Sequence, residues 1–121
     1  MWRAPYRDVM LLVSLTLNAL VLAPVLYVLA ANGEAAALVW GSDGPARRIL
    51  AAIYCAILAV SVVLLVLLAL GRDVVAWSQA LLAVQVIYKF LTVAFVGLRN
   101  PVVVANLAIA VVHSATLVVL S

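Results

Sequence analysis

The sequence contains very few acidic residues, and none of them lies inside a long apolar run. Among the 121 residues there are four Asp and Glu residues. They stand at the ends of apolar runs or between them, as Asp8, Glu34, Asp43 and Asp73. Acid–base catalysis and oxygen-ligated cation sites need carboxylates that converge on one place. We therefore predict that the protein is not an enzyme.

Cysteine and histidine are equally scarce, with one residue of each. A single cysteine, Cys55, excludes an intrachain disulfide and a cysteine-based metal cluster, and its place in an apolar run favours packing. A haem held by two histidines is excluded as well, because His113 has no second histidine to join it. The sequence also contains no Ser, His and Asp grouping, no metal-ligand spacing and no Gly-rich phosphate loop. We expect neither a catalytic site nor a metal site.

Charged residues make up only 9% of the chain, whereas hydrophobic residues make up 70%. Soluble proteins have about 25% charged and about 45 to 50% apolar residues, so this composition predicts an integral membrane protein. The net charge of +3 does not indicate a nucleic-acid partner, because the basic residues are scattered instead of clustered. We expect the partners to be membrane lipids, other membrane subunits or further copies of the chain.

Four apolar runs can be marked by their polar ends, at residues 9–31, 49–70, 74–98 and 102–120. Each is close to the roughly 20 residues that a helix needs to cross the hydrocarbon core. Because unpaired backbone groups are not tolerated in lipid, each run should be helical despite its many Val and Ile residues. The predicted fold is an all-α membrane protein, a single domain over residues 1–121 with four transmembrane helices in an up-down bundle. Pro24 should at most kink the first helix.

The ends of the runs carry signals for helix starts and for the membrane interface. Asn100 and Pro101 form an N-cap and a first helical position, and Asp73 is placed to cap the third helix. The longest connection runs from residue 32 to 48, and its stretch from Glu34 to Trp40 has the character of a short interfacial helix. The tryptophans fit an aromatic belt, with Trp2 and Trp77 on one face of the membrane and Trp40 on the other.

The orientation in the membrane is weakly determined, because the arginines divide equally between the two faces. One face has Arg3, Arg7 and Arg72, and the other has Arg47, Arg48 and Arg99. The N-terminal pair favours cytoplasmic termini, and an equal division is also expected of a protein that inserts in both orientations and pairs antiparallel. The abundance of Ala, Val and Leu with few lysines favours a bacterial plasma membrane.

Lys89 is the one charged side chain inside an apolar run, and other polar residues share its helical face. In the third run, Ser78, Gln85, Lys89 and Thr92 follow at intervals of seven, four and three residues. Similar stripes hold Asn106, His113 and Thr116 in the fourth run, Ser14 and Asn18 in the first, and Tyr54 and Ser61 in the second. These faces should meet in the bundle interior. The candidate residues for binding a ligand, an ion or a partner are Lys89, His113, Asn106, Asn18, Gln85 and Ser61.

No acidic residue within the four runs can neutralise Lys89, which we place roughly 15 Å below the Arg99 side. The side chain could lose its proton, or it could extend to the headgroups. Alternatively, it is neutralised from outside the chain, by a carboxylate of another subunit, an anionic ligand or lipid, or an ion in transit. A charge at this depth costs about 2.5 to 3.5 kcal/mol, which makes Lys89 the strongest indication of function.

The remaining polar residues have alternative interpretations. The amides of Asn18, Gln85 and Asn106 fit interhelical hydrogen bonds of about 0.6 kcal/mol each. His113 fits such a bond too, or else a proton, quinone, haem or pigment site; no other cofactor is expected.

The sequence leaves three candidate functions. The favoured one is a non-catalytic accessory or assembly subunit of a larger membrane complex. The alternatives are a small homo-oligomeric transporter or channel for an anion or a proton, and a binder of lipid, quinone or pigment.

Overall fold

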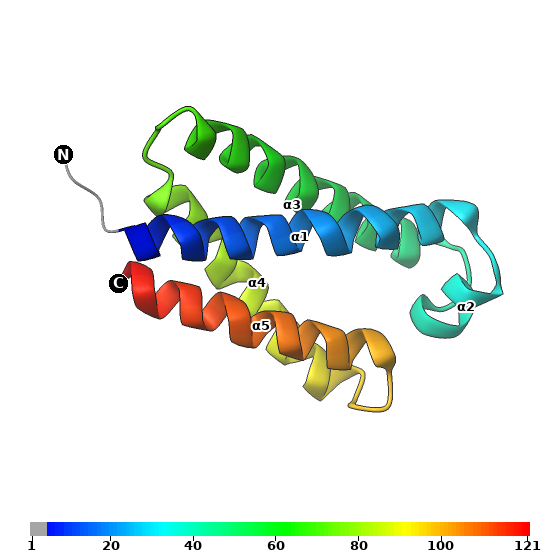
Figure 1. Cartoon of the computed structure of the whole chain (residues 1–121). Coiled ribbons are helices and arrows are strands. Elements are labelled where there is room, and N and C mark those ends of the chain that lie inside the picture. Colours follow the sequence, from blue (N-terminus) through cyan, green and yellow to red (C-terminus); the bar gives the residue numbers. More distant parts are fainter. Residues whose placement is uncertain (1–4) are drawn as a thin grey trace.

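In a computed structural model, residues 5–121 form five helices and no strand. Trp2 and Arg3, which the sequence placed in the aromatic belt and among the orienting charges, lie outside these described residues. The helices are α1 (Pro5–Ala31), α2 (Glu34–Trp40), α3 (Pro45–Ala69), α4 (Val75–Phe95) and α5 (Pro101–Leu120) (Figure 1).

Four of these helices, α1, α3, α4 and α5, are long and apolar enough to cross a membrane. This confirms the prediction of four apolar helices and the membrane character of the chain. The helix ends differ from the ends of the apolar runs. Both α1 and α3 begin four residues before their runs, each at a proline, because a proline at the first helical position has a backbone already suited to the helix. By contrast, α4 stops at Phe95, and Gly97 follows with a φ of 98° that breaks the helix.

Both residues predicted to mark helix starts accept a hydrogen bond from the backbone of the helix that follows. The Asn100 side chain accepts a hydrogen bond of 2.9 Å from the backbone N–H of Val102, as an N-cap should. Asp73 accepts one of 3.0 Å from Val75. At the end of α3, the N–H groups of Gly71 and Arg72 bond back to the carbonyls of Leu68 and Leu67, a Schellman motif that needs the positive φ of Gly71. Pro24 lies inside α1, which continues through it.

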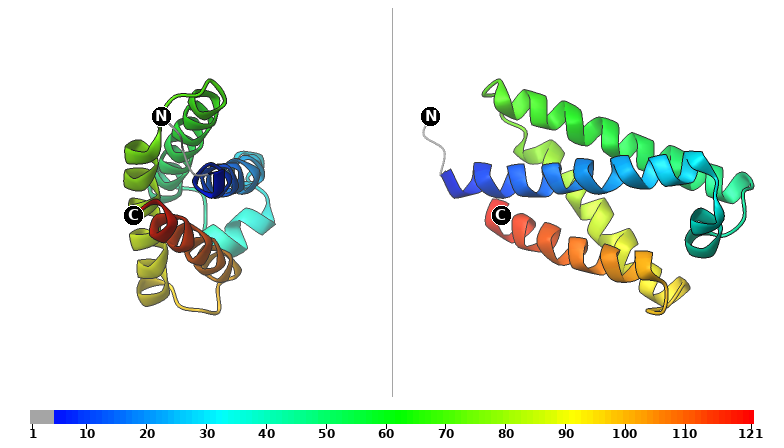
Figure 2. Two further views of the ribbon diagram at one scale, coloured as in Figure 1. Left: turned by 60° about the vertical axis from the view of Figure 1, so that its left-hand side comes forward. Right: turned by 45° about the vertical axis from the view of Figure 1, so that its right-hand side comes forward.

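The long helices pack as two pairs, α1 against α3 and α4 against α5. The pairs meet mainly where α1 contacts α5, whereas α3 and α4 touch little although they are consecutive. Figure 2 shows the two pairs from two further directions. The start of α1 lies beside the end of α5, since Arg7 Nη2 donates a hydrogen bond of 2.7 Å to the carbonyl of Leu120.

The short helix α2 occupies the residues from Glu34 to Trp40, at the end of the molecule away from the termini (Figure 1). Asn100 holds its C-terminal end through a 2.9 Å hydrogen bond to the carbonyl of Val39. Arg47 of α3 donates to the carbonyl of Gly41 at 3.0 Å and to the side chain of Asn32. These bonds attach α2 to α3 and to the turn between α4 and α5.

The apolar interior consists of two groups of buried side chains. One, near the termini, comprises Leu11, Leu15, Leu64, Val74 and Leu120. The other, near α2, comprises Leu22, Leu29, Ala36, Tyr54 and Ile57. Cys55, which was expected to pack, is instead exposed on α3. The prediction was wrong because both the buried and the lipid-facing side of α3 are mainly apolar, so apolar neighbours do not identify the buried face.

Candidate functional site

All six candidate residues are buried, and Asn106 is the most exposed of them at 8%. Lys89 is 4% exposed, so its ammonium neither faces lipid nor reaches the headgroups. The structure does not gather the six into one group. It places Asn18 and Ser61 with His113, places Asn106 with Lys89, and leaves Gln85 outside both groups.

The first group, which we call the His113 cluster, consists of Ser14, Asn18, Ser61, His113 and Thr116. The imidazole Nε2 lies 2.8 Å from Oδ1 of Asn18, and Nδ1 lies 3.0 Å from Oγ of Ser14. Ser14 lies 2.6 Å from the hydroxyl of Thr116, and the Asn18 amide donates to Ser61 at 3.1 Å. Because a carbonyl oxygen only accepts, Nε2 must carry the proton, and Nδ1 then accepts from Ser14.

Both ring nitrogens of His113 are therefore engaged, and the cluster joins α1, α3 and α5 through their polar faces. Its members are 0 to 2% exposed, and each makes a hydrogen bond across the interface. A fully paired polar network specifies how helices pack, since any other arrangement leaves buried groups unpaired. A quinone, haem or proton acceptor at His113 would have to displace Ser14 or Asn18.

The second group surrounds a cavity of about 90 Å³, which we call the Lys89 chamber. Its lining comes from all five helices: Val21, Leu22, Val25, Trp40, Tyr54, Tyr88, Lys89, Val102, Ala105, Asn106 and Ile109. Lys89 Nζ donates to Oδ1 of Asn106 at 3.3 Å and lies 5.5 Å from the centre of the Tyr88 ring.

The chamber holds more hydrogen-bond donors than acceptors. The ammonium of Lys89 has three protons, and Asn106 accepts one. The indole N–H of Trp40 is buried and lies close to the Tyr54 hydroxyl, without a hydrogen bond of good geometry among the described residues. Within residues 5–121 no carboxylate forms an ion pair with Lys89. The chamber thus contains a basic amine and, among the described residues, no carboxylate bonded to it.

Gln85 and Ser78 continue the polar face of α4 away from the chamber. The amide nitrogen of Gln85 and the hydroxyl of Ser78 are both buried without a hydrogen-bond partner. The Gln85 amide nitrogen therefore does not donate the interhelical hydrogen bond that the sequence predicted. Together with Lys89, these atoms form a row of incompletely paired polar groups along α4.

The size of the Lys89 chamber limits what it can accept. Pockets for drug-sized ligands measure about 300 to 1,000 Å³, so 90 Å³ suits a carboxylate or a small anion and not a quinone or pigment. The part of the chain that the structure describes contains no group of three His, Cys, Asp or Glu residues able to hold a metal ion.

Several residues of the cluster and the chamber were not among the six candidates. Ser14, Tyr54 and Thr116 lay on the polar stripes and could have been included by extending the candidate set to the whole of each stripe. Trp40 and Tyr88 could not, because their place around Lys89 depends on how five helices meet.

Comparisons of the chain with protein-family models, with curated proteins and with solved structures give no match.

Proposed function

We propose that this chain is a non-catalytic accessory or assembly subunit of a larger membrane complex. Four spans cross a bacterial plasma membrane as an up-down bundle with cytoplasmic termini, and α2 lies at the opposite interface. Trp77 near the start of α4, 73% exposed, and Trp40 at the end of α2 support this placement, since tryptophan favours both membrane interfaces.

The proposal is carried by one observation, the buried amine of Lys89 that no carboxylate of the described residues neutralises. Among these residues, its hydrogen-bond partner is the neutral amide of Asn106 at 3.3 Å. A charge inside the bilayer is costly, and a carboxylate beside it lowers that cost while adding a charge-assisted hydrogen bond. The one carboxylate within the four spans, that of Asp8 in the first turn of α1, lies roughly 20 Å along the helix from Val21, where α1 begins to line the chamber. A partner's Asp or Glu side chain therefore supplies the carboxylate.

The Lys89 chamber has a side through which such a group can enter. Ala105 of α5 lines the chamber and is exposed, while Val21 of α1 and Val102 of α5 are half-buried. Ala108, one turn further along α5, is exposed as well. Small residues on an outer face let a second helix approach closely. We therefore assign the surface of α5 beside Ala105 to the partner helix.

Native purification with mass spectrometry tests the proposal directly. We expect the chain to co-purify in fixed stoichiometry with an unrelated membrane subunit. Lys89→Met should release that subunit while the chain stays folded. Ala105→Phe should also release it by closing the chamber, whereas Ala52→Phe, at an exposed alanine of α3 outside the chamber, should not.

A carboxylate introduced beside Lys89 within the chain gives a more specific test of the proposal. Asn106→Asp places a carboxylate at the one position already bonded to Lys89, so it should release the partner while stabilising the isolated chain. A lysine with a purely structural role would gain the same stability and keep its partner. Retention of the partner by both Lys89→Met and Asn106→Asp would overturn the proposal.

The row of unpaired polar atoms on α4 favours a second candidate, a homo-oligomeric transporter for a small anion or a proton. Ser78, Gln85 and Lys89 would form a polar path once water or an ion reached them. This function predicts a homo-oligomer in native mass spectrometry. It also predicts that Lys89→Met abolishes flux into liposomes without changing assembly.

A further inference from the structure

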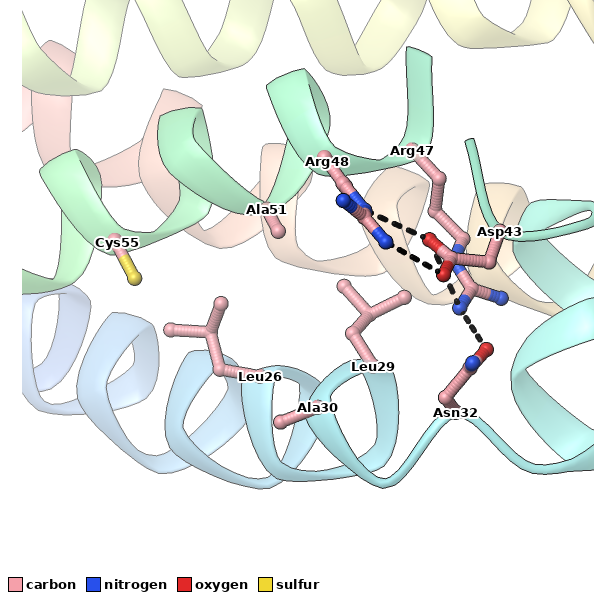
Figure 3. Close-up of a pocket in the computed structure, with 9 residues that line it drawn as sticks. All are labelled: Leu26, Leu29, Ala30, Asn32, Asp43, Arg47, Arg48, Ala51 and Cys55. Atoms are coloured by element: carbon pink, nitrogen blue, oxygen red, sulfur yellow. Dashed lines mark hydrogen bonds and ion pairs between the residues drawn. The ribbon is translucent and has the colours of Figure 1, made fainter. Parts of the chain in front are cut away.

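A groove of about 630 Å³ lies between α1 and α3, at the end of the molecule that carries α2 (Figure 3). Its floor is apolar and consists of Leu26, Leu29, Ala30, Ala51 and Cys55. Its rim is polar and consists of Asn32, Asp43, Arg47 and Arg48. In Figure 3 the four rim side chains gather at one end of the groove, and Cys55 lies toward the other. The groove is therefore amphipathic along its length.

The guanidinium groups of the two rim arginines differ in their exposure and in the hydrogen bonds that they already make. The Arg47 side chain, 5% exposed, bonds to Gly41 and Asn32 and lies 3.8 Å from the Asp43 carboxylate. The Arg48 side chain is 76% exposed and donates to both oxygens of Asp43, from Nε at 3.1 Å and from Nη2 at 3.0 Å. Its Nη1 makes no bond within the described chain. With one carboxylate against two guanidinium groups, the rim has a charge of +1.

The N-terminal end of α3 adds to this positive potential. The 25-residue helix begins at Pro45, and its N-cap residue Gly44 provides no side-chain cap. Its first turn contains no acidic residue. The unpaired N–H groups and the helix dipole at such an end favour an anion, and Arg47 and Arg48 lie in that turn.

The arrangement matches a phospholipid in both chemistry and depth. Arg48 lies at the end of an apolar helix, where headgroups lie, while Ala51 and Cys55 follow roughly 5 and 10 Å deeper along α3. We propose that this groove binds one anionic phospholipid, with its phosphodiester on Arg48 and the start of α3 and an acyl chain over the floor to Cys55. The inference is independent of Lys89 and of the proposed accessory role.

An anionic headgroup is favoured over a zwitterionic one by the charges of the rim. The only carboxylate, Asp43, is already occupied by Arg48 and Arg47, so the ammonium or choline of a zwitterionic lipid finds no free partner. A phosphodiester without that cation retains its full attraction to the rim. Basic pockets between transmembrane helices recognise anionic headgroups in this way.

Cys55 makes the test direct, because it is the sole cysteine, it is exposed, and it lies on the floor of the groove. The whole chain is placed in nanodiscs of phosphatidylcholine alone or with phosphatidylglycerol, and the rate of maleimide labelling is measured. Native mass spectrometry counts the lipids retained by the same samples. We expect phosphatidylglycerol to slow labelling and to be retained selectively as one molecule per chain.

Four variants separate the rim from the floor. Arg48→Gln should reduce the preference for phosphatidylglycerol about fivefold, the effect of one basic residue at a membrane surface. Asp43→Asn should increase it, because the carboxylate competes with the lipid phosphate for Arg48. Ala51→Phe should weaken retention of both lipids by filling the floor. Arg99→Gln is the matched control, since Arg99 is exposed beside the same end of the bundle but outside the groove.

Labelling at a second position controls for general effects of the bilayer. In a Cys55→Ala, Ala52→Cys double variant, the thiol lies on an exposed position of α3 outside the groove, and phosphatidylglycerol should not protect it. Equal retention of the two lipids, or equal protection at positions 52 and 55, would show adventitious annular lipid only and would overturn the inference. Lys89→Met should leave lipid retention unchanged, so failure of the proposed accessory role is distinguishable.

Discussion

The His113 cluster and the Lys89 chamber are both buried polar groups among apolar helices, and they differ in completeness. In the cluster, both nitrogens of His113 are bonded, at 2.8 and 3.0 Å. In the chamber, Lys89 has one neutral acceptor and Trp40 has none. A complete network stabilises the packing that completes it, whereas an incomplete one costs stability and is retained for another purpose. The difference supports our proposal that the cluster is structural and that the chamber binds a partner.

Removing the imidazole should have the largest effect on stability. His113→Leu leaves Oδ1 of Asn18 buried and unpaired and removes one of the two hydrogen bonds of Ser14, and we expect the free energy of unfolding to fall by about 2 to 3 kcal/mol. Thermal unfolding of the purified chain in detergent measures this. If folded molecules of this variant also failed to bind the partner subunit, the cluster would have a binding role. It would then not differ in function from the chamber.

Removing the Lys89 ammonium should raise the stability of the isolated chain. Lys89→Met replaces a buried charge with an apolar chain of similar length, and we expect the isolated chain to gain about 1 to 2 kcal/mol. The same unfolding assay, performed without any partner, gives the sign. A loss of stability equal to that of His113→Leu would show that Lys89 is a structural residue.

A substitution at Gln85 tests whether the row of unpaired polar atoms on α4 lowers stability, as we expect of the chamber. Gln85→Leu removes an amide nitrogen that lacks a partner, so we expect no loss and a gain of about 1 kcal/mol. Ser61→Ala provides the contrast, since it deletes a 3.1 Å bond to Asn18 and should cost about 0.6 kcal/mol. If both substitutions destabilised the chain alike, Gln85 would be fully bonded in the membrane.

The smallest expected effect concerns the ion pair of Asp43 and Arg48, which is open to water. It lies outside the His113 cluster and the Lys89 chamber. The Arg48 guanidinium bonded to it holds the pKa of this carboxyl below its ordinary value of 3.8. The resulting stability is present above pH 3.8 and is lost as the pH falls through the lowered pKa. An NMR titration of the Asp43 side chain should show this shift, and Arg48→Gln should abolish it. An unchanged pKa in that variant would contradict the assignment to Arg48.

Particular residues show how far the sequence could lead. The polar stripes of Lys89, Asn106 and His113 were visible because side chains three, four and seven residues apart share a helical face. The separation of those stripes into a paired cluster and an unpaired chamber was not visible, because it depends on which helices touch. Cys55 illustrates the same limit: in a chain this apolar, composition does not distinguish a lipid-facing position from a buried one.

The number, length and helical nature of the spans follow from the sequence, because the hydrocarbon core permits only segments that satisfy their own backbone. The lack of a carboxylate for Lys89 within the apolar runs also follows from the sequence. Only the tertiary structure decided that α1, α3 and α5 meet around His113, and that Trp40 and Asn106 enclose Lys89. It also brought Arg47 and Arg48 to the end of an apolar groove. The reason is physical: periodicity determines the faces of a helix, but side-chain packing between helices selects which faces meet.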